Sequence, residues 1–136
     1  MAVLKDATAI VGIGQTPFAK KLTETERALA CRAILAALDD AGISPDEVDA
    51  LASYTMEETD EVEVAKALGL GDLTFFSKVG YGGGGSCATV AHLAAAIATG
   101  QATVGVAWRS RKRGSGPRPW KNTTVQPVPY THFQTT

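Results

Sequence analysis

The sequence predicts an α/β fold with a mainly parallel sheet, in the element order β-α-β-α-β-α-β. Two observations lead to this prediction: four short apolar runs are typical of strands, and the segments between them have helical start and stop signals. Strands that alternate with helices form parallel sheets with right-handed crossovers. With 136 residues, 45% of them hydrophobic, the chain is long enough for one domain with a core.

Capping residues and glycines mark the predicted elements. Thr23 and Glu26 form a capping-box pattern that opens the first helix, and Gly42 ends it. Ser44 and Pro45 are an N-cap and a first helical residue for a single turn. The predicted strands span 7–13, 49–55, 73–79 and 103–108, and the later helices span 61–68 and 86–99.

Composition divides the chain into two parts. We assign residues 1–113 to one α/β domain and residues 114–136 to an irregular, proline-rich loop or C-terminal end. Charge divides it elsewhere, because all 14 acidic residues lie within 1–72. Five basic residues then lie close together: Arg109, Arg111, Lys112, Arg113 and Arg118. Such a run attracts phosphate, a nucleotide, nucleic acid or an acidic partner surface.

The cysteines and the apolar segments indicate a reduced, cytoplasmic protein. Cys31 and Cys87 lie in predicted helices, and no secretory signal accompanies them. The most apolar stretch, 87–98, is shorter than the roughly 20 residues that cross a bilayer. We therefore expect no membrane span. We also expect no nucleic-acid partner, because Trp108 and Trp120 are not interleaved with the basic residues as a stacking platform.

A glycine loop, 80–86, lies between a predicted strand and a predicted helix. Consecutive glycines allow a close approach to the backbone, and the free N–H groups of a helix N-terminus favour an anion. The candidate binding residues are Gly83, Gly84, Gly85, Ser86, Arg109 and Arg111. The loop also matches GxGxxG, which leaves an NADP-binding domain as an alternative. No acid follows Asp72 to bind a ribose, although the arginines could meet a 2′-phosphate.

The helix after this loop is apolar on every side. No residue between Lys78 and Arg109 carries a fixed charge. A helix that is apolar all round is expected to be buried on all sides. A two-layer domain of this size cannot supply that cover, so the helix predicts contact with another domain or a second subunit.

These segments resemble the thiolase superfamily. VGIGQTPFAK at 11–20 is similar to the superfamily's opening strand and loop, and YGGGGSCATVAHLAAAIATGQATVGVAWRSRKRGSGPRPW at 81–120 is similar to the lipid-transfer, sterol-carrier-thiolase-like branch. The resemblance implies the N-terminal half of a two-half fold, with a buried central helix. It implies an acyl-CoA thioester as substrate, no covalently bound cofactor, a homodimer and a possible partner with an OB-like, DUF35-type domain.

The resemblance also bears on the catalytic candidates, which are Cys87 and Tyr81. The superfamily's nucleophilic cysteine opens the central helix, and counting back from Gly100 places that position near Gly83, one turn before Cys87. The chain is therefore more similar to homologues that release a short acyl-CoA from a steroid side chain by retro-aldol cleavage. The neighbouring alanines favour a small buried hydrophobe for Cys87 over an activated thiolate, and Tyr81 could equally bind substrate or line a dimer seam. His92 is expected to be a core histidine, and no metal site is expected.

The sequence therefore predicts a thiolase-like lipid-transfer protein that handles steroid or fatty acyl-CoA, by C–C cleavage or acyl transfer in the complete family. We expect this chain alone to be incomplete and inactive. A non-catalytic scaffold that dimerises and binds a partner is the other alternative to an enzyme, beside the NADP-binding domain.

Overall fold

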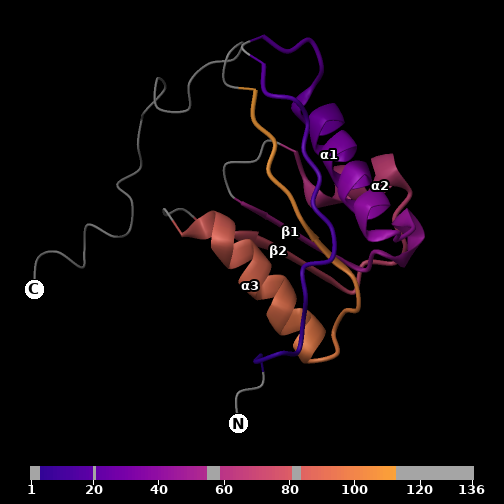
Figure 1. The fold of residues 1–136 in the computed structure, drawn as a ribbon, viewed down its shortest axis with the longest axis vertical. Helices are drawn as coiled ribbons and strands as arrows, with labels where there is room; N and C mark the ends of the chain where they lie inside the picture. Colours follow the sequence, from indigo (N-terminus) through magenta and orange to yellow (C-terminus); the bar gives the residue numbers. More distant parts are fainter. Residues whose placement is uncertain (1–3, 20, 55–58, 81–83, 113–136) are drawn as a thin grey trace, which may run out of the picture.

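A three-stranded parallel sheet with helices on both faces forms the centre of the computed structural model, which describes residues 4–19, 21–54, 59–80 and 84–112 (Figure 1). The strand order is β2-β1-β3. The elements are α1 (Glu26–Ala41), a 3-10 turn (Pro45–Glu47), β1 (Ala50–Tyr54), α2 (Glu61–Leu68), β2 (Phe75–Val79), α3 (Gly85–Ala98) and β3 (Gly105–Ala107). The predicted α/β fold with a parallel sheet is confirmed.

The two faces of β1 bury different sets of side chains, because successive residues of a strand point to opposite sides. Leu51 packs with α1, α2 and Val106 in the larger core cluster. Ala50 and Ala52 pack with α3 on the other face, where their small side chains let the helix lie close to the sheet. Figure 1 shows this arrangement, with α3 on one side of the strands and α1 and α2 on the other.

Asp49 holds both outer strands in register with β1. Its carboxylate accepts hydrogen bonds from the backbone N–H groups of Thr103, at 2.8 and 3.0 Å, and Val104, at 2.9 Å. Its carbonyl oxygen accepts the backbone N–H of Thr74 at 2.8 Å. The Asp49 carboxylate thus occupies the N–H groups of the two residues just before β3. Both outer strands begin two residues later than predicted, at Phe75 and Gly105.

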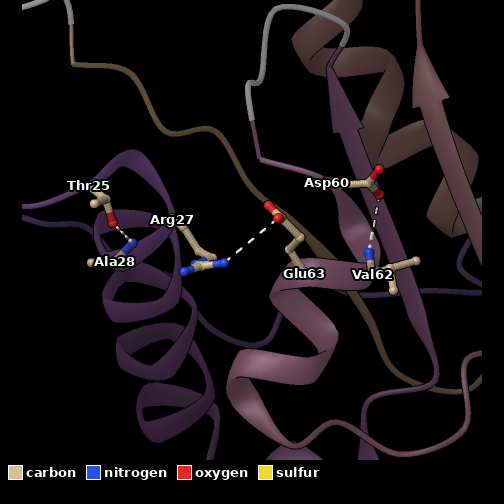
Figure 2. Close-up of polar contacts among 6 residues, drawn as sticks. All are labelled: Thr25, Arg27, Ala28, Asp60, Val62 and Glu63. Atoms are coloured by element: carbon tan, nitrogen blue, oxygen red, sulfur yellow. Dashed lines mark hydrogen bonds and ion pairs between the residues drawn. The ribbon is translucent and has the colours of Figure 1, made fainter.

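The helix ends follow the predicted chemistry with one correction. The N-cap of α1 is Thr25 and not Thr23: its hydroxyl accepts the backbone N–H of Ala28 at 3.1 Å (Figure 2). Asp60 caps α2 in the same way through Val62 (Figure 2). Gly42 and Gly69 end α1 and α2 with φ angles of 66° and 63°, a left-handed conformation that favours glycine.

An ion pair links the two helices on this face of the sheet. The Arg27 guanidinium lies 3.7 Å from the Glu63 carboxylate, as Figure 2 shows. Both side chains are about half exposed, so the pair contributes about 0–1 kcal/mol.

The first predicted strand, 7–13, is wrong. Residues 7–19 form no strand, and the segment lies along α1 instead. A Cβ at Gly12 would be 2.2 Å from the Ala37 carbonyl oxygen, and the Ile13 N–H donates to Asp40 at 2.9 Å. The segment is extended, yet no strand of the described residues pairs with it. An apolar groove of about 420 Å³ separates residues 8–12 from β3, with α1 and α3 as its walls.

Helix α3 is covered on one face only by the described residues. Leu93, Ala96 and Thr89 are buried against the sheet, whereas Cys87 and Val90 are exposed, Val90 to 42%. The cover that the sequence predicts for the outer face is therefore not supplied by the described part of this chain. Among these residues, no helix combines the length and the hydropathy that a bilayer span needs.

Candidate functional site

The carboxyl edge of the sheet meets the N-terminus of α3. Because β1, β2 and β3 run parallel, the segments that follow them leave the sheet at this same edge. Tyr54 ends β1, Gly80 follows β2 and Arg109 follows β3 closely. Ligands of open α/β sheets bind beyond the carboxyl ends of the strands, so this edge is the candidate site.

Gly85 is required where α3 begins. A Cβ at this position would lie 2.3 Å from Cε2 and 2.7 Å from Cδ2 of Tyr54, and 3.0 Å from the Gly80 carbonyl oxygen. The Tyr54 ring is itself buried, with 7% of its surface exposed. The sequence predicted that something approaches the backbone of the glycine loop closely. At Gly85 that neighbour is the side chain of Tyr54. By contrast, a Cβ at Gly84 would meet nothing within 4 Å.

Arg109 connects the end of β1 with the start of α3. Its guanidinium carbon lies 5.4 Å from the centre of the Tyr54 ring, and its Nη1 donates a hydrogen bond to Ser86 Oγ at 3.2 Å. The structure therefore brings together two predicted binding residues, Ser86 and Arg109. It adds Tyr54, which sequence reasoning missed. The sequence feature that could have indicated Tyr54 is its position as the last residue of a buried strand, at the carboxyl edge of the sheet.

Arg111 lies elsewhere, at the N-terminus of α1. Its Nη1 is 4.0 Å from Glu26 Oε2, and both side chains are mostly buried. The backbone N–H of Lys112 donates to Glu26 Oε1 at 2.6 Å, and Ser110 Oγ donates to the Glu26 carbonyl oxygen at 2.7 Å. The two arginines that the sequence groups together thus contact helices on opposite faces of the sheet. Arg111 fastens the segment after β3 to α1.

The remaining candidates have mixed surroundings. Cys87 is exposed on the first turn of α3, so the alternative of a small buried hydrophobe does not describe it within this chain. His92 is not a core residue: it is exposed and its Nδ1 lies 3.1 Å from Ser77 Oγ. Burial raises the pKa of the half-buried Cys31 thiol. Tyr81 and Gly83 lie outside the described residues.

A second polar group lies at the end of β1, on the α2 side. Ser53 Oγ donates to the buried Glu61 carboxylate. The neighbouring Asp60 has a pKa below its ordinary value, first because it accepts the Val62 N–H, then through the Glu61 side chain and Lys78. Across the described ranges, no group of three or more histidine, cysteine or acidic side chains is placed to hold a metal ion.

Comparison with known proteins supports this description. No family model matches the chain. It is 53% identical over 116 residues to a 17-hydroxy-3-oxo-4-pregnene-20-carboxyl-CoA lyase of Mycobacterium tuberculosis, and 49% identical over 118 residues to a steroid side-chain-cleaving aldolase of Thermomonospora curvata. These matches cover 85% and 87% of this chain. The homologues of this chain are steroid side-chain-cleaving aldolases.

The fold of this chain agrees with a solved structure. The Ltp2-ChsH2(DUF35) aldolase superposes with a TM-score of 0.84, at 44% identity over 96% of this chain. The predicted resemblance to the thiolase-like, steroid-aldolase branch is confirmed by these matches. The chain spans 30% of the length of each curated relative and 34% of the solved aldolase chain.

Proposed function

We propose that this chain is part of a lyase that cleaves a carbon–carbon bond of a steroid acyl-CoA thioester by a retro-aldol reaction. The observation that carries the proposal is the 53% identity over 116 residues to the mycobacterial lyase. The name of that relative describes a hydroxyl on carbon 17 and a thioester on carbon 20. A hydroxyl at this distance from a thioester carbonyl is the arrangement that a retro-aldol cleavage requires.

The reaction needs two kinds of group from the protein. A general base removes the proton of the 17-hydroxyl. The hydroxyl oxygen then becomes the carbonyl oxygen of a 17-ketone as the bond from carbon 17 to carbon 20 breaks. The bonding electrons pass to the thioester as an enolate, which is then protonated to a short acyl-CoA. Donors aimed at the thioester oxygen stabilise the negative charge that develops there.

This chain supplies features suited to the second task. The first turn of α3 offers backbone N–H groups at the carboxyl edge of the sheet, and Arg109 adds a cation beside them. We propose that residues 84–86 face the CoA thioester and that Arg109, which donates to Ser86 Oγ, lies beside them. Cys87 and Tyr81 stay candidates for contact with substrate. Other acid–base groups would come from parts of the enzyme outside this chain, which spans 30% of its relatives.

The proposal includes partners. The solved Ltp2-ChsH2(DUF35) aldolase joins, as its name states, an aldolase to a DUF35 protein, which supports a DUF35-type partner for this chain. We also propose a homodimer and a cytoplasmic location, as the sequence predicts. No observation favours a non-catalytic scaffold. The NADP alternative needs arginines to meet a 2′-phosphate near the glycine loop, whereas Arg111 is paired with Glu26 on the opposite face of the sheet.

The test is an assay of the complete protein that contains this chain, together with a DUF35-type partner. The substrate is a steroid with a 17-hydroxyl and a CoA thioester on carbon 20, and mass spectrometry measures the 17-ketosteroid and the short acyl-CoA. We expect both products in equal amounts. The matched control is the same thioester without the 17-hydroxyl, which has no proton to release and stays intact. Acyl transfer to added thiol without a 17-ketone, or no turnover of either thioester, would contradict the proposal.

A further inference from the structure

Two contacts of Arg109 restrain different parts of the candidate site. The guanidinium lies over the Tyr54 ring and so covers the end of β1. The same group donates to Ser86 Oγ, and Ser86 is the second residue of α3. One side chain thus ties the segment after β3 to the two other elements that meet at the carboxyl edge.

The Tyr54 ring transmits this restraint to the helix. One edge of the ring lies against the backbone of Gly85, so closely that even a Cβ would not fit. The ring is 7% exposed and has little space to move outward. The position of the first turn of α3 is therefore set by contact with the ring at Gly85 and by the hydrogen bond at Ser86.

We propose that Arg109 is a positioning residue that fixes the first turn of α3, and with it the backbone N–H groups that face the thioester. The proposal rests on the proposed function, because it needs the thioester to be bound at this helix N-terminus. A misplacement of about 1 Å in a catalytic arrangement lowers the rate by up to about 100-fold. An arginine suits this role because a planar guanidinium stacks on an aromatic ring and donates hydrogen bonds in its own plane, whereas a lysine ammonium does not combine the two.

The test compares variants in the complete protein with its partner. Arg109→Ala should lower kcat by about 10- to 100-fold. Arg109→Lys should restore less than half of the lost activity, since it keeps the charge but not the stacking. Arg27→Ala is the matched control, because it removes an arginine from an exposed ion pair on the opposite face and should leave kcat and KM unchanged.

A second measurement reports on position directly. Hydrogen–deuterium exchange of the first hydrogen-bonded amides of α3, at residues 88 and 89, should speed up several-fold in Arg109→Ala and stay unchanged in Arg27→Ala. Tyr54→Leu should reproduce both effects, and combining it with Arg109→Ala should add little, because the two side chains act as one unit.

Two results would overturn the proposal. A raised KM with unchanged kcat, together with full rescue by lysine, would make Arg109 a direct binding group for the phosphates of CoA. Unchanged activity and unchanged exchange in Arg109→Ala would make it a surface cation. Absence of cleavage by the unmodified protein would contradict the proposed function instead, while the exchange comparison would still decide whether Arg109 positions α3.

Discussion

Substituting Gly85 by alanine should destabilise the protein although alanine is the better helix former. The new Cβ would lie 2.3 and 2.7 Å from two carbons of the Tyr54 ring and 3.0 Å from a backbone oxygen. Overpacking of this kind costs about 1–3 kcal/mol. The helix propensity of alanine returns at most about 1 kcal/mol, and less at a first helical position. The net loss of unfolding free energy should be about 1–2 kcal/mol.

The assay is urea unfolding followed by circular dichroism. Gly80→Ala is the matched control, because its Cβ would meet no atom within 4 Å. Restricting the unfolded chain at such a site is neutral or stabilising by up to about 1 kcal/mol. Replacing Tyr54 by alanine should remove most of the further cost of Gly85→Ala, since the ring carbons are then absent and only the contact with the Gly80 carbonyl oxygen remains. A Gly85→Ala variant as stable as the Gly80→Ala control would refute the close contact between the ring and α3.

Three further predictions concern stability and association. Asp49→Ala should lower the unfolding free energy by at least about 2 kcal/mol in urea titrations, because its carboxylate accepts two backbone N–H groups before β3; a loss below about 1 kcal/mol would contradict this role. Asp60 has a lowered pKa, so the stability it contributes is present above its ordinary pKa of about 3.9 and is lost as the pH falls through the lower folded value. Thermal melts of Asp60→Asn should therefore depend less on pH below about pH 4 than those of the unmodified chain, and equal slopes would count against the cap. The isolated chain should elute from size-exclusion columns as an oligomer or aggregate, because Val90 and Phe76 are 42% and 64% exposed; a compact monomer would show that these surfaces need no cover.

Local signals predicted the elements that depend on neighbouring residues. The bounds of α2, the stops at Gly42 and Gly69 and the single turn at Pro45 follow from capping chemistry that acts within a few residues. The N-cap of α1 was misplaced because Thr23 and Thr25 offer the same hydroxyl. In the structure it is Thr25 whose hydroxyl accepts a backbone N–H three residues later, that of Ala28.

Long-range contacts account for what the sequence could not predict. The apolar run 7–13 reads as a strand, but strand pairing depends on a neighbour that no local pattern reveals. Arg109 and Arg111 are equivalent in the local sequence. Their roles differ because Arg111 lies beside Glu26 of α1, whereas Arg109 donates to Ser86 of α3. The sequence did not predict a role for Tyr54, because that role depends on its contact with Gly85, which only the folded backbone creates.

The most direct test of the proposed retro-aldol reaction is to run the cleavage by the complete protein in deuterium oxide. Retro-aldol cleavage leaves a thioester enolate that takes its new hydrogen from exchangeable positions. We predict a short acyl-CoA with one deuterium on the carbon next to the thioester, formed together with an equal amount of 17-ketosteroid. A released acyl-CoA without deuterium at that carbon, or a steroid product without the 17-ketone, would contradict this mechanism.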